Sequence, residues 1–233
     1  AIRGRGGGSP HDGVTNYDAE ARRFARDLTH LSLAAMTIGN GGMYAVVTVL
    51  PTVQAEFGTS RADASLPYTL LMIGFGFGGI VMGKLADRYG VMLPVMIGAG
   101  GLGAGFIAAG MSGSLVGFAV AHGLLLGLLG SSATFAPLVA DTSLWFVRRR
   151  GIAVAICASG NYLAGAVWPP IVQHFIETVG WRTTYIGLGI FCAVTMPLLA
   201  LMMRQRPPAA VAAATRKSSS AAPSTRPFGL GMN

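Results

Sequence analysis

Long runs of apolar residues, each free of Asp, Glu, Lys and Arg, alternate along the chain with short polar segments. A helix needs about 20 mostly apolar residues to cross the roughly 30 Å hydrocarbon core of a bilayer. Four runs have this length, and the run between Arg88 and Asp141 is long enough for two crossings joined by the turn "GMSGS". The pattern predicts six transmembrane helices, at residues 31–52, 66–84, 91–110, 115–140, 151–174 and 183–203.

The composition agrees with a protein whose solvent is lipid. Apolar residues make up 52% of the chain and charged residues only 11%, whereas charged residues make up about a quarter of an ordinary soluble domain. The expected fold class is therefore an all-α, multi-pass integral membrane protein. Cys157 and Cys192 each lie within an apolar run, outside any Cys or His cluster, so they are expected in the core. No disulfide, metal site or cofactor is indicated.

Lys and Arg residues gather on one side of the predicted bundle. Of the 17 Lys and Arg residues in the chain, only Arg61 and Arg182 fall on the other side. Because loops rich in Lys and Arg stay in the cytoplasm, both termini are expected there, with the helices in the cell membrane. The net charge of +8 then reflects topology, and the expected partner is the lipid bilayer rather than nucleic acid.

The chain divides into three segments of different character. Residues 1–30 are Gly-rich at the start and are expected to form a cytoplasmic segment that is partly disordered, with a short surface helix at 18–28. Residues 31–203 form the six-helix bundle. Residues 204–233 are rich in Ala, Pro and Ser, which predicts a flexible cytoplasmic tail or a linker between two halves of a larger protein.

The stretch "LLMIGFGFGGIVMG" at residues 70–83 contains the spacing G-x-G-x-x-G, in Gly74, Gly76 and Gly79. A dinucleotide-binding loop with this spacing needs a strand before it and a soluble helix after it. Here the glycines lie inside an uncharged span, and the next span repeats the spacing in Gly98, Gly100 and Gly103. We therefore predict close helix packing through pairs of small residues. The pairs are Gly74 with Gly78, Gly79 with Gly83, and Gly101 with Gly105.

Polar residues inside the spans indicate a candidate cavity, because polar side chains within a bilayer face protein or water. In the first span they recur on one helical face, and in the fifth span they are adjacent. These candidate cavity-lining residues are Thr37, Asn40 and Tyr44, followed on the same face by Thr48, and Asn161 and Tyr162. Two interpretations stay open for each of them: a wall of an aqueous or substrate-lined cavity, or a hydrogen bond between helices.

The fourth and fifth spans carry further polar residues and breaks. The fourth span has a stripe made of Gly123, Gly127, Ser131, Thr134 and Asp141. His122 and His174 lie towards the outer ends of their spans; packing or interfacial roles are favoured for them over proton coupling or haem ligation. Three prolines are expected to kink or end regular helix, and these are Pro137, Pro169 and Pro170.

The most specific motif is "GKLADRYG", which joins the second and third spans on the predicted cytoplasmic side. A carboxylate at a membrane boundary usually has a cationic partner, and an ion pair made on one side only can hold one conformation. Asp141 occupies a similar boundary position, close to the arginines at 148–150. The candidate cytoplasmic gate comprises Gly83, Asp87, Arg88, Gly90 and Asp141.

In this motif the chain resembles the major facilitator superfamily, whose signature between helices 2 and 3 has the form G-x-L-a-D-r-x-G followed by basic residues. The stretches "WFVRRRGIAVAICASGNYLAG" at 145–165 and "VGWRTTY" at 179–185 resemble its monocarboxylate-porter branch. At two places the chain departs from the family pattern in residues that bear on function. After Gly90, the residues at 91–93 are apolar where the family has more cations, and His122 lies near the position of the usual arginine in helix 4.

The resemblance implies secondary active transport of a small solute, such as a monocarboxylate or another organic anion, by alternating access between two six-helix halves. It implies a C-terminal six-helix half or a second copy as partner, a coupling ion, and no enzymatic activity. Since the superfamily has twelve helices, the chain is expected to be a fragment or a truncated half.

Two other classes of membrane protein remain as alternatives. A six-span intramembrane protease would use Ser131 or Ser132 in the fourth span, but it needs a base His in the sixth, where the sequence has none. A structural membrane protein without transport activity is the second alternative.

Overall fold

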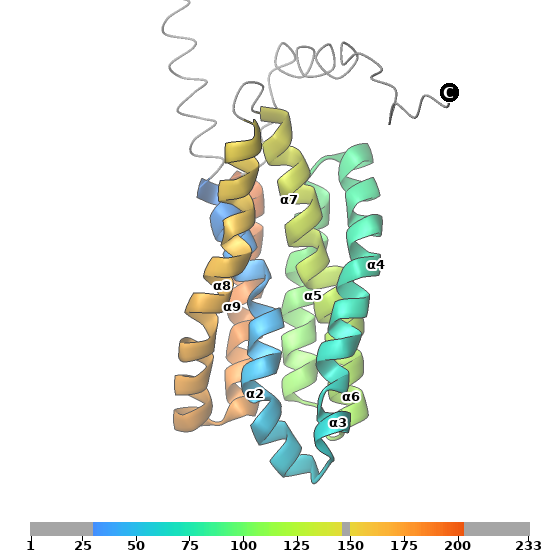
Figure 1. The fold of residues 1–233 in the computed structure, drawn as a ribbon, viewed down its shortest axis with the longest axis vertical. Helices are drawn as coiled ribbons and strands as arrows, with labels where there is room; N and C mark the ends of the chain where they lie inside the picture. The colour runs from blue at the N-terminus through green and yellow to red at the C-terminus, as the bar shows by residue number, and fades with distance from the viewer. Residues whose placement is uncertain (1–29, 146–149, 203–233) are drawn as a thin grey trace, which may run out of the picture.

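The computed structural model describes residues 30–145 and 150–202, which form a bundle of long helices running alternately in opposite directions (Figure 1). In this part of the chain, six helical segments are long and apolar enough to cross a membrane: His30–Phe57, Arg61–Tyr89, Met92–Gly110, Leu115–Ser143, Gly151–Val179 and Trp181–Met202. They confirm the six predicted spans and extend most of them by several residues. The predictions for residues 1–29 and 204–233 lie outside the described residues.

The helices follow one another through short turns. Their bounds are α2 Gly41–Phe57, α3 Arg61–Ala64, α4 Leu66–Tyr89, α5 Met92–Gly110, α6 Leu115–Val120, η1 Ala121–Ser131, α7 Ser132–Trp145, α8 Arg150–Val179 and α9 Trp181–Met202. The α2–α3, α5–α6 and α8–α9 turns lie at one end of the bundle, called here the distal end (Figure 1). Residues 30 and 202 lie at the opposite, terminal end. At the distal end, Gly180 has a φ of 84°, which lets α8 pass directly into α9.

The first span is not one regular helix. Residues 30–39 are helical, Asn40 forms a turn with a ψ of 1°, and α2 begins at Gly41. Glycines flank the turn at positions 39, 41 and 42. The interruption lies near the middle of the span, which the sequence pattern did not reveal because its apolar run continues through it.

The fourth span changes its helical type along its length. It passes from α6 through the π-helix η1 into α7 without a break. The predicted polar stripe assumed 3.6 residues per turn, and the wider π-turns alter which residues share a face. Gly127 packs so closely on α4 that a Cβ there would lie 2.5 Å from the Leu71 carbonyl oxygen. Ser131 Oγ donates a hydrogen bond to Gly39 O at 3.0 Å. At these positions, contact between helices is therefore the correct interpretation.

Glycines bring α4 and η1 into backbone contact. A Cβ at Gly74 would lie 2.1 Å from the Gly123 carbonyl oxygen, and one at Gly78 would lie 2.3 Å from that of Leu128. By contrast, a Cβ at Gly79 or Gly83 would meet nothing within 4 Å. The predicted packing of Gly74 with Gly78 is confirmed, whereas that of Gly79 with Gly83 is wrong, because those two glycines face away from the neighbouring helices.

The same close approach recurs between α5 and the fourth span. A Cβ at Gly101 would lie 2.7 Å from Leu129 Cβ, and one at Gly105 would lie 2.8 Å from Leu126 Cγ, so the third predicted pair is confirmed. The two stretches with the G-x-G-x-x-G spacing lie within the uninterrupted helices α4 and α5. They are therefore not dinucleotide-binding loops. The members of the two motifs that pack closely on a neighbouring helix are Gly74, Gly98 and Gly103.

An aromatic cluster fills the core near the distal end. His122 and Tyr185 are fully buried, and Phe118 lies between them and Trp181. His122 Nδ1 contacts the Phe118 carbonyl oxygen at 2.8 Å, and its Nε2 lies 3.4 Å from the Tyr185 hydroxyl. The packing role favoured for His122 is confirmed, and the core positions of both cysteines are confirmed as well.

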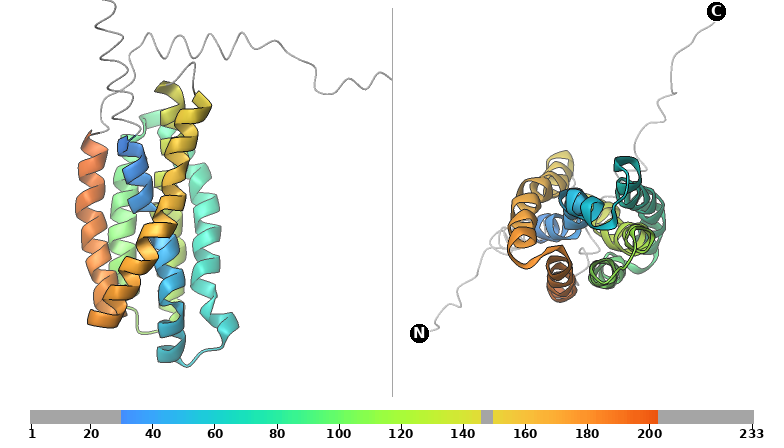
Figure 2. Two further views of the ribbon diagram at one scale, coloured as in Figure 1. Left: turned by 60° about the vertical axis from the view of Figure 1, so that its left-hand side comes forward. Right: turned by 90° about the horizontal axis from the view of Figure 1, so that it is seen from below.

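The three prolines do not end their helices. Pro137 lies inside α7, and Pro169 and Pro170 lie inside α8, which continues to Val179. Seen from below, α8 and α4 lie on either side of α2 (Figure 2). Figure 1 shows α7 between α8 and α4 in the terminal half, so α2, α4, α7 and α8 form one broad face of the bundle.

The adjacent glycines of α4 give a matched test of this packing. We expect Gly78→Ala to lower the free energy of unfolding by about 1–3 kcal/mol, because its methyl group overlaps the η1 backbone. Gly79→Ala faces open space and should be neutral, or stabilising by up to ~1 kcal/mol through its higher helix propensity. Thermal unfolding midpoints of the detergent-purified variants measure both, and equal midpoints would contradict the close approach of α4 and η1.

Candidate functional site: the interrupted first span

The residues predicted to line a cavity come from two helices that lie against each other. Thr37 Oγ1, in the first half of the first span, donates hydrogen bonds to Leu33 O at 2.8 Å and Gly160 O of α8 at 3.2 Å. The Tyr44 ring covers α8 at Gly165, where a Cβ would lie 2.8 Å from Tyr44 Cε1. The structure therefore joins the polar stripe of the first span to the segment of α8 that carries Asn161 and Tyr162.

Side chains from neighbouring helices satisfy the backbone at the interruption. Trp168 Nε1 of α8 donates to Thr37 O at 2.8 Å, and Ser131 Oγ of η1 donates to Gly39 O. Asn40 Nδ2 donates to Met36 O at 3.0 Å. Backbone groups within a bilayer have no water to replace a lost helical bond. These donors stabilise a break in the helix near the middle of the apolar span.

Two amide oxygens at this face have no hydrogen-bond donor among the described residues. Asn40 Oδ1 belongs to a fully buried side chain, and Asn161 Oδ1 is also buried. A buried acceptor without a donor costs about 1–3 kcal/mol. The sequence indicated both residues through their position on polar faces, but it could not show that their oxygens lack partners.

Three tyrosines from three helices converge on the same region. Tyr44 interacts electrostatically with Tyr68 of α4 and Tyr162 of α8. Tyr162 is 78% exposed and Tyr68 is 38% exposed. Sequence reasoning missed Tyr68, because it begins the second span without polar neighbours at helical spacing. The face thus offers neutral hydroxyl and amide groups that can hydrogen-bond to a polar solute.

The predicted gate motif lies at the terminal end. α4 ends at Tyr89, and Gly90 follows with a φ of 86°. Asp87 and Arg88 are exposed, and the Arg88 guanidinium lies 5.4 Å from the centre of the Tyr89 ring. Asp141 lies on α7 and is half-buried. The arginines at 148 and 149 lie outside the described residues, and the gate role of the motif stays a prediction.

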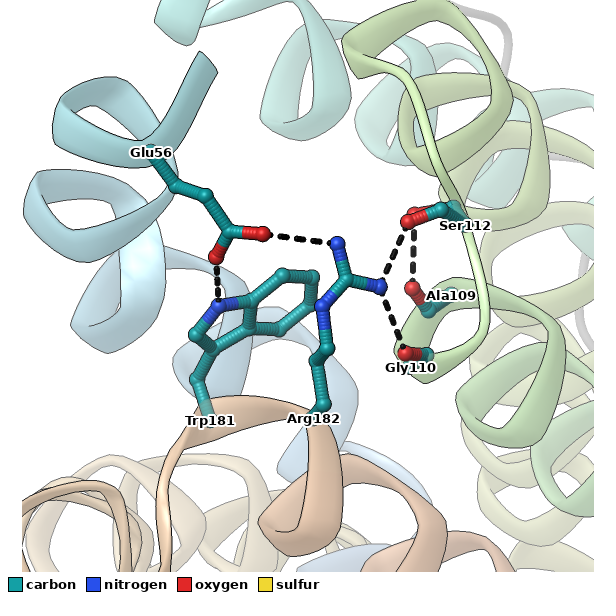
Figure 3. Close-up of polar contacts among 6 residues, drawn as sticks. All are labelled: Glu56, Ala109, Gly110, Ser112, Trp181 and Arg182. Carbon is teal, nitrogen blue, oxygen red and sulfur yellow. Dashed lines mark hydrogen bonds and ion pairs between the residues drawn. The ribbon is translucent and has the colours of Figure 1, made fainter.

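A second polar cluster lies at the distal end and was not predicted (Figure 3). Glu56, in the last turn of α2, accepts a hydrogen bond from Trp181 Nε1. It also forms an ion pair with Arg182, in which Glu56 Oε1 lies 2.7 Å from Arg182 Nη2. Arg182 Nη1 donates to the carbonyl oxygens of Gly110 at 3.1 Å and Ser112 at 2.6 Å. The sequence indicates Arg182 as a marker of topology and as part of the stretch "VGWRTTY", but no local pattern connects it with Glu56.

The Trp168 hydrogen bond can be tested by a substitution that keeps an aromatic side chain but removes the indole N–H. We expect Trp168→Phe to lower the free energy of unfolding by about 1–3 kcal/mol, because the Thr37 carbonyl then lacks its donor in a buried site. Tyr162→Phe is the control, since it also removes one polar atom but from an exposed side chain. Thermal unfolding in detergent compares the two variants, and an unchanged midpoint for Trp168→Phe would contradict this role.

The family model of the Major Facilitator Superfamily matches residues 31–230. Monocarboxylate transporter 6 of Mus musculus is 27% identical over 175 residues, which cover 74% of this chain and 37% of that protein. Monocarboxylate transporter 11 of Homo sapiens is 29% identical over 177 residues, with the same two shares. The uncharacterized MFS-type transporter YcxA of Bacillus subtilis is 31% identical over 161 residues, which cover 67% of this chain and 38% of that protein. The chain thus spans less than two fifths of the length of these relatives. With six apolar spans and a family match over most of its length, this chain belongs to the Major Facilitator Superfamily.

Proposed function

We propose that the chain forms the N-terminal six-helix half of a secondary active transporter for a small organic anion of the monocarboxylate class. The superfamily membership supports transport, and the names of the mammalian relatives support the substrate class. Because the chain spans only part of those relatives, the complete site requires a second six-helix half or a second copy. The proposed location is the cell membrane, with both termini in the cytoplasm as the distribution of Lys and Arg indicates.

The interrupted first span is the observation that carries this proposal. In transporters, substrate and coupling-ion sites lie near the bilayer midplane, where discontinuous helices expose polar groups. Here the interruption lies at Asn40, whose Oδ1 has no donor among the described residues. We assign Thr37, Asn40, Tyr44, Asn161 and Tyr162 to the wall of the substrate site, together with Tyr68.

The wall is uncharged, which limits what this half contributes. Its amide and hydroxyl groups can orient a carboxylate or a protonated acid through hydrogen bonds, but they cannot neutralise an anion. No Lys or Arg lies in the middle of any described span. The counter-charge, from a cationic side chain or a coupling ion, is therefore assigned to the other half. Alternating access would open the site to either side, with Asp87, Arg88 and Asp141 closing the cytoplasmic end.

The contacts of the fourth span disfavour the protease alternative. Ser131 Oγ donates to Gly39 O, and Ser132 Oγ donates to Leu128 O. The one described histidine in the fourth span, His122, lies in the aromatic cluster with Tyr185. The serine hydroxyls are therefore committed to helix packing rather than paired with a base.

Transport in liposomes tests the proposal. The protein used is the full-length one, which here means this half together with the second half that the proposal requires. We expect uptake of radiolabelled pyruvate, and Asn40→Leu should reduce uptake at least tenfold, because it removes the unpartnered acceptor and keeps the branched shape of the side chain. The substitution also removes the bond from Asn40 Nδ2 to Met36 O, so thermal unfolding in detergent checks that the variant folds. Ser159→Ala is the control, since its exposed hydroxyl bonds only to Ile156 O within α8. Uptake by neither parent nor control would reject the substrate class, and equal uptake by Asn40→Leu and parent would remove Asn40 from the site.

A further inference from the structure

One face of the distal part of α2 is exposed, while Val49 and Val53 on the other face are fully buried. In its last turn Ala55 and Glu56 are exposed, while Gln54 and Phe57 are half-buried. Along its length α2 packs mainly against α8, and it makes only marginal contact with α9. The Glu56 contacts with Trp181 and Arg182 are therefore the main polar link between α2 and α9 (Figure 3).

Arg182 and Glu56 differ in the contacts that hold them in this cluster. Besides its pairing with Glu56, Arg182 donates hydrogen bonds to Gly110 O and Ser112 O, and its guanidinium lies 4.4 Å from the centre of the Trp181 ring. These carbonyls end α5, where a cation is stabilised by the helix dipole. Among the described residues, Glu56 bonds through its side chain to Trp181 and Arg182, and that side chain is 40% exposed. Glu56 can therefore leave Arg182 and become hydrated at little cost.

The interruption at Asn40 gives α2 a pivot at its other end. The helical turn before the interruption is fixed, because Thr37 bonds to Gly160 and Trp168, and Gly39 bonds to Ser131. No regular helix continues this anchorage across Asn40 into α2. Because hinges are short segments that absorb backbone rotation, the interruption gives the distal end of α2 a point about which it can turn relative to the first half of the span.

We propose that Glu56 is the mobile partner of a distal latch on Trp181 and Arg182, and that the distal side of the transport site opens only when Glu56 is released. This inference rests on the proposed transport function. Release lets α2 bend at the interruption and carries Tyr44 and Thr48 with it, while α5 and α9 stay joined through Arg182. Glu56, Trp181 and Arg182 act here as positioning residues, because they act through α2 rather than by contact with the solute.

A reversible cross-link tests the latch directly. In the full-length protein in liposomes, Glu56→Cys/Arg182→Cys would be bridged with a bifunctional methanethiosulfonate reagent, and pyruvate uptake measured before and after reduction. We expect bridging to lower uptake at least tenfold and reduction to restore it. The control is Ser112→Cys/Arg182→Cys, which bridges α9 to the α5–α6 turn, a link that the proposal keeps closed. Full uptake by the bridged Glu56 pair would overturn the proposal.

A second measurement needs no substrate and so separates the latch from the proposed cargo. Thr48→Cys serves as a reporter, labelled from the distal side with a membrane-impermeant maleimide. Adding Glu56→Gln, which keeps the shape but removes the charge, should increase the labelling rate severalfold. Adding Glu177→Gln is the matched control, since it removes another acid at the distal end whose carboxylate bonds only to Gln173 within α8. Equal rates for the two additions would overturn the latch even if pyruvate is not transported.

Discussion

Backbone-to-backbone contact between helices is the constraint on which the rest of this structure depends. Lipid provides no hydrophobic force that drives one apolar helix against another, so the helices must gain their contacts by approaching closely. Gly74 and Gly78 of α4 meet the carbonyl oxygens of Gly123 and Leu128 on η1, where no side chain would fit. The fourth span therefore packs between α4 and α5, and from there the Ser131 hydroxyl reaches the first span.

The candidate site depends on this position of the fourth span between α4 and α5. Ser131 lies on η1 and donates to Gly39 at the point where the first span is interrupted, while Trp168 donates to Thr37 from the other side. A helix break in a bilayer persists only where neighbours satisfy its backbone. The packing of the fourth and fifth spans thus maintains the irregular segment that presents Asn40 and Tyr44.

The two ends of the bundle use charge in different ways. At the terminal end, the motif residues Asp87 and Arg88 are exposed at the end of α4. At the distal end, Arg182 joins the end of α5 to the start of α9, and Glu56 adds the end of α2. In the described spans, a long middle without Lys or Arg separates these two charged ends.

The sequence by itself determined the six spans, the buried cysteines and the family, because the length of a charge-free run and a local motif depend only on neighbouring residues. It also indicated Thr37, Asn40 and Tyr44, since helical spacing places them on one face. It could not separate Gly78 from Gly79, because both have the same neighbours and differ only in which helix they face. The interruption at Asn40, the π-helix, the place of Tyr68 and the pairing of Glu56 with Arg182 were decided by the tertiary structure. Each depends on a donor, a backbone or a charge that lies far away in the chain and arrives only through packing.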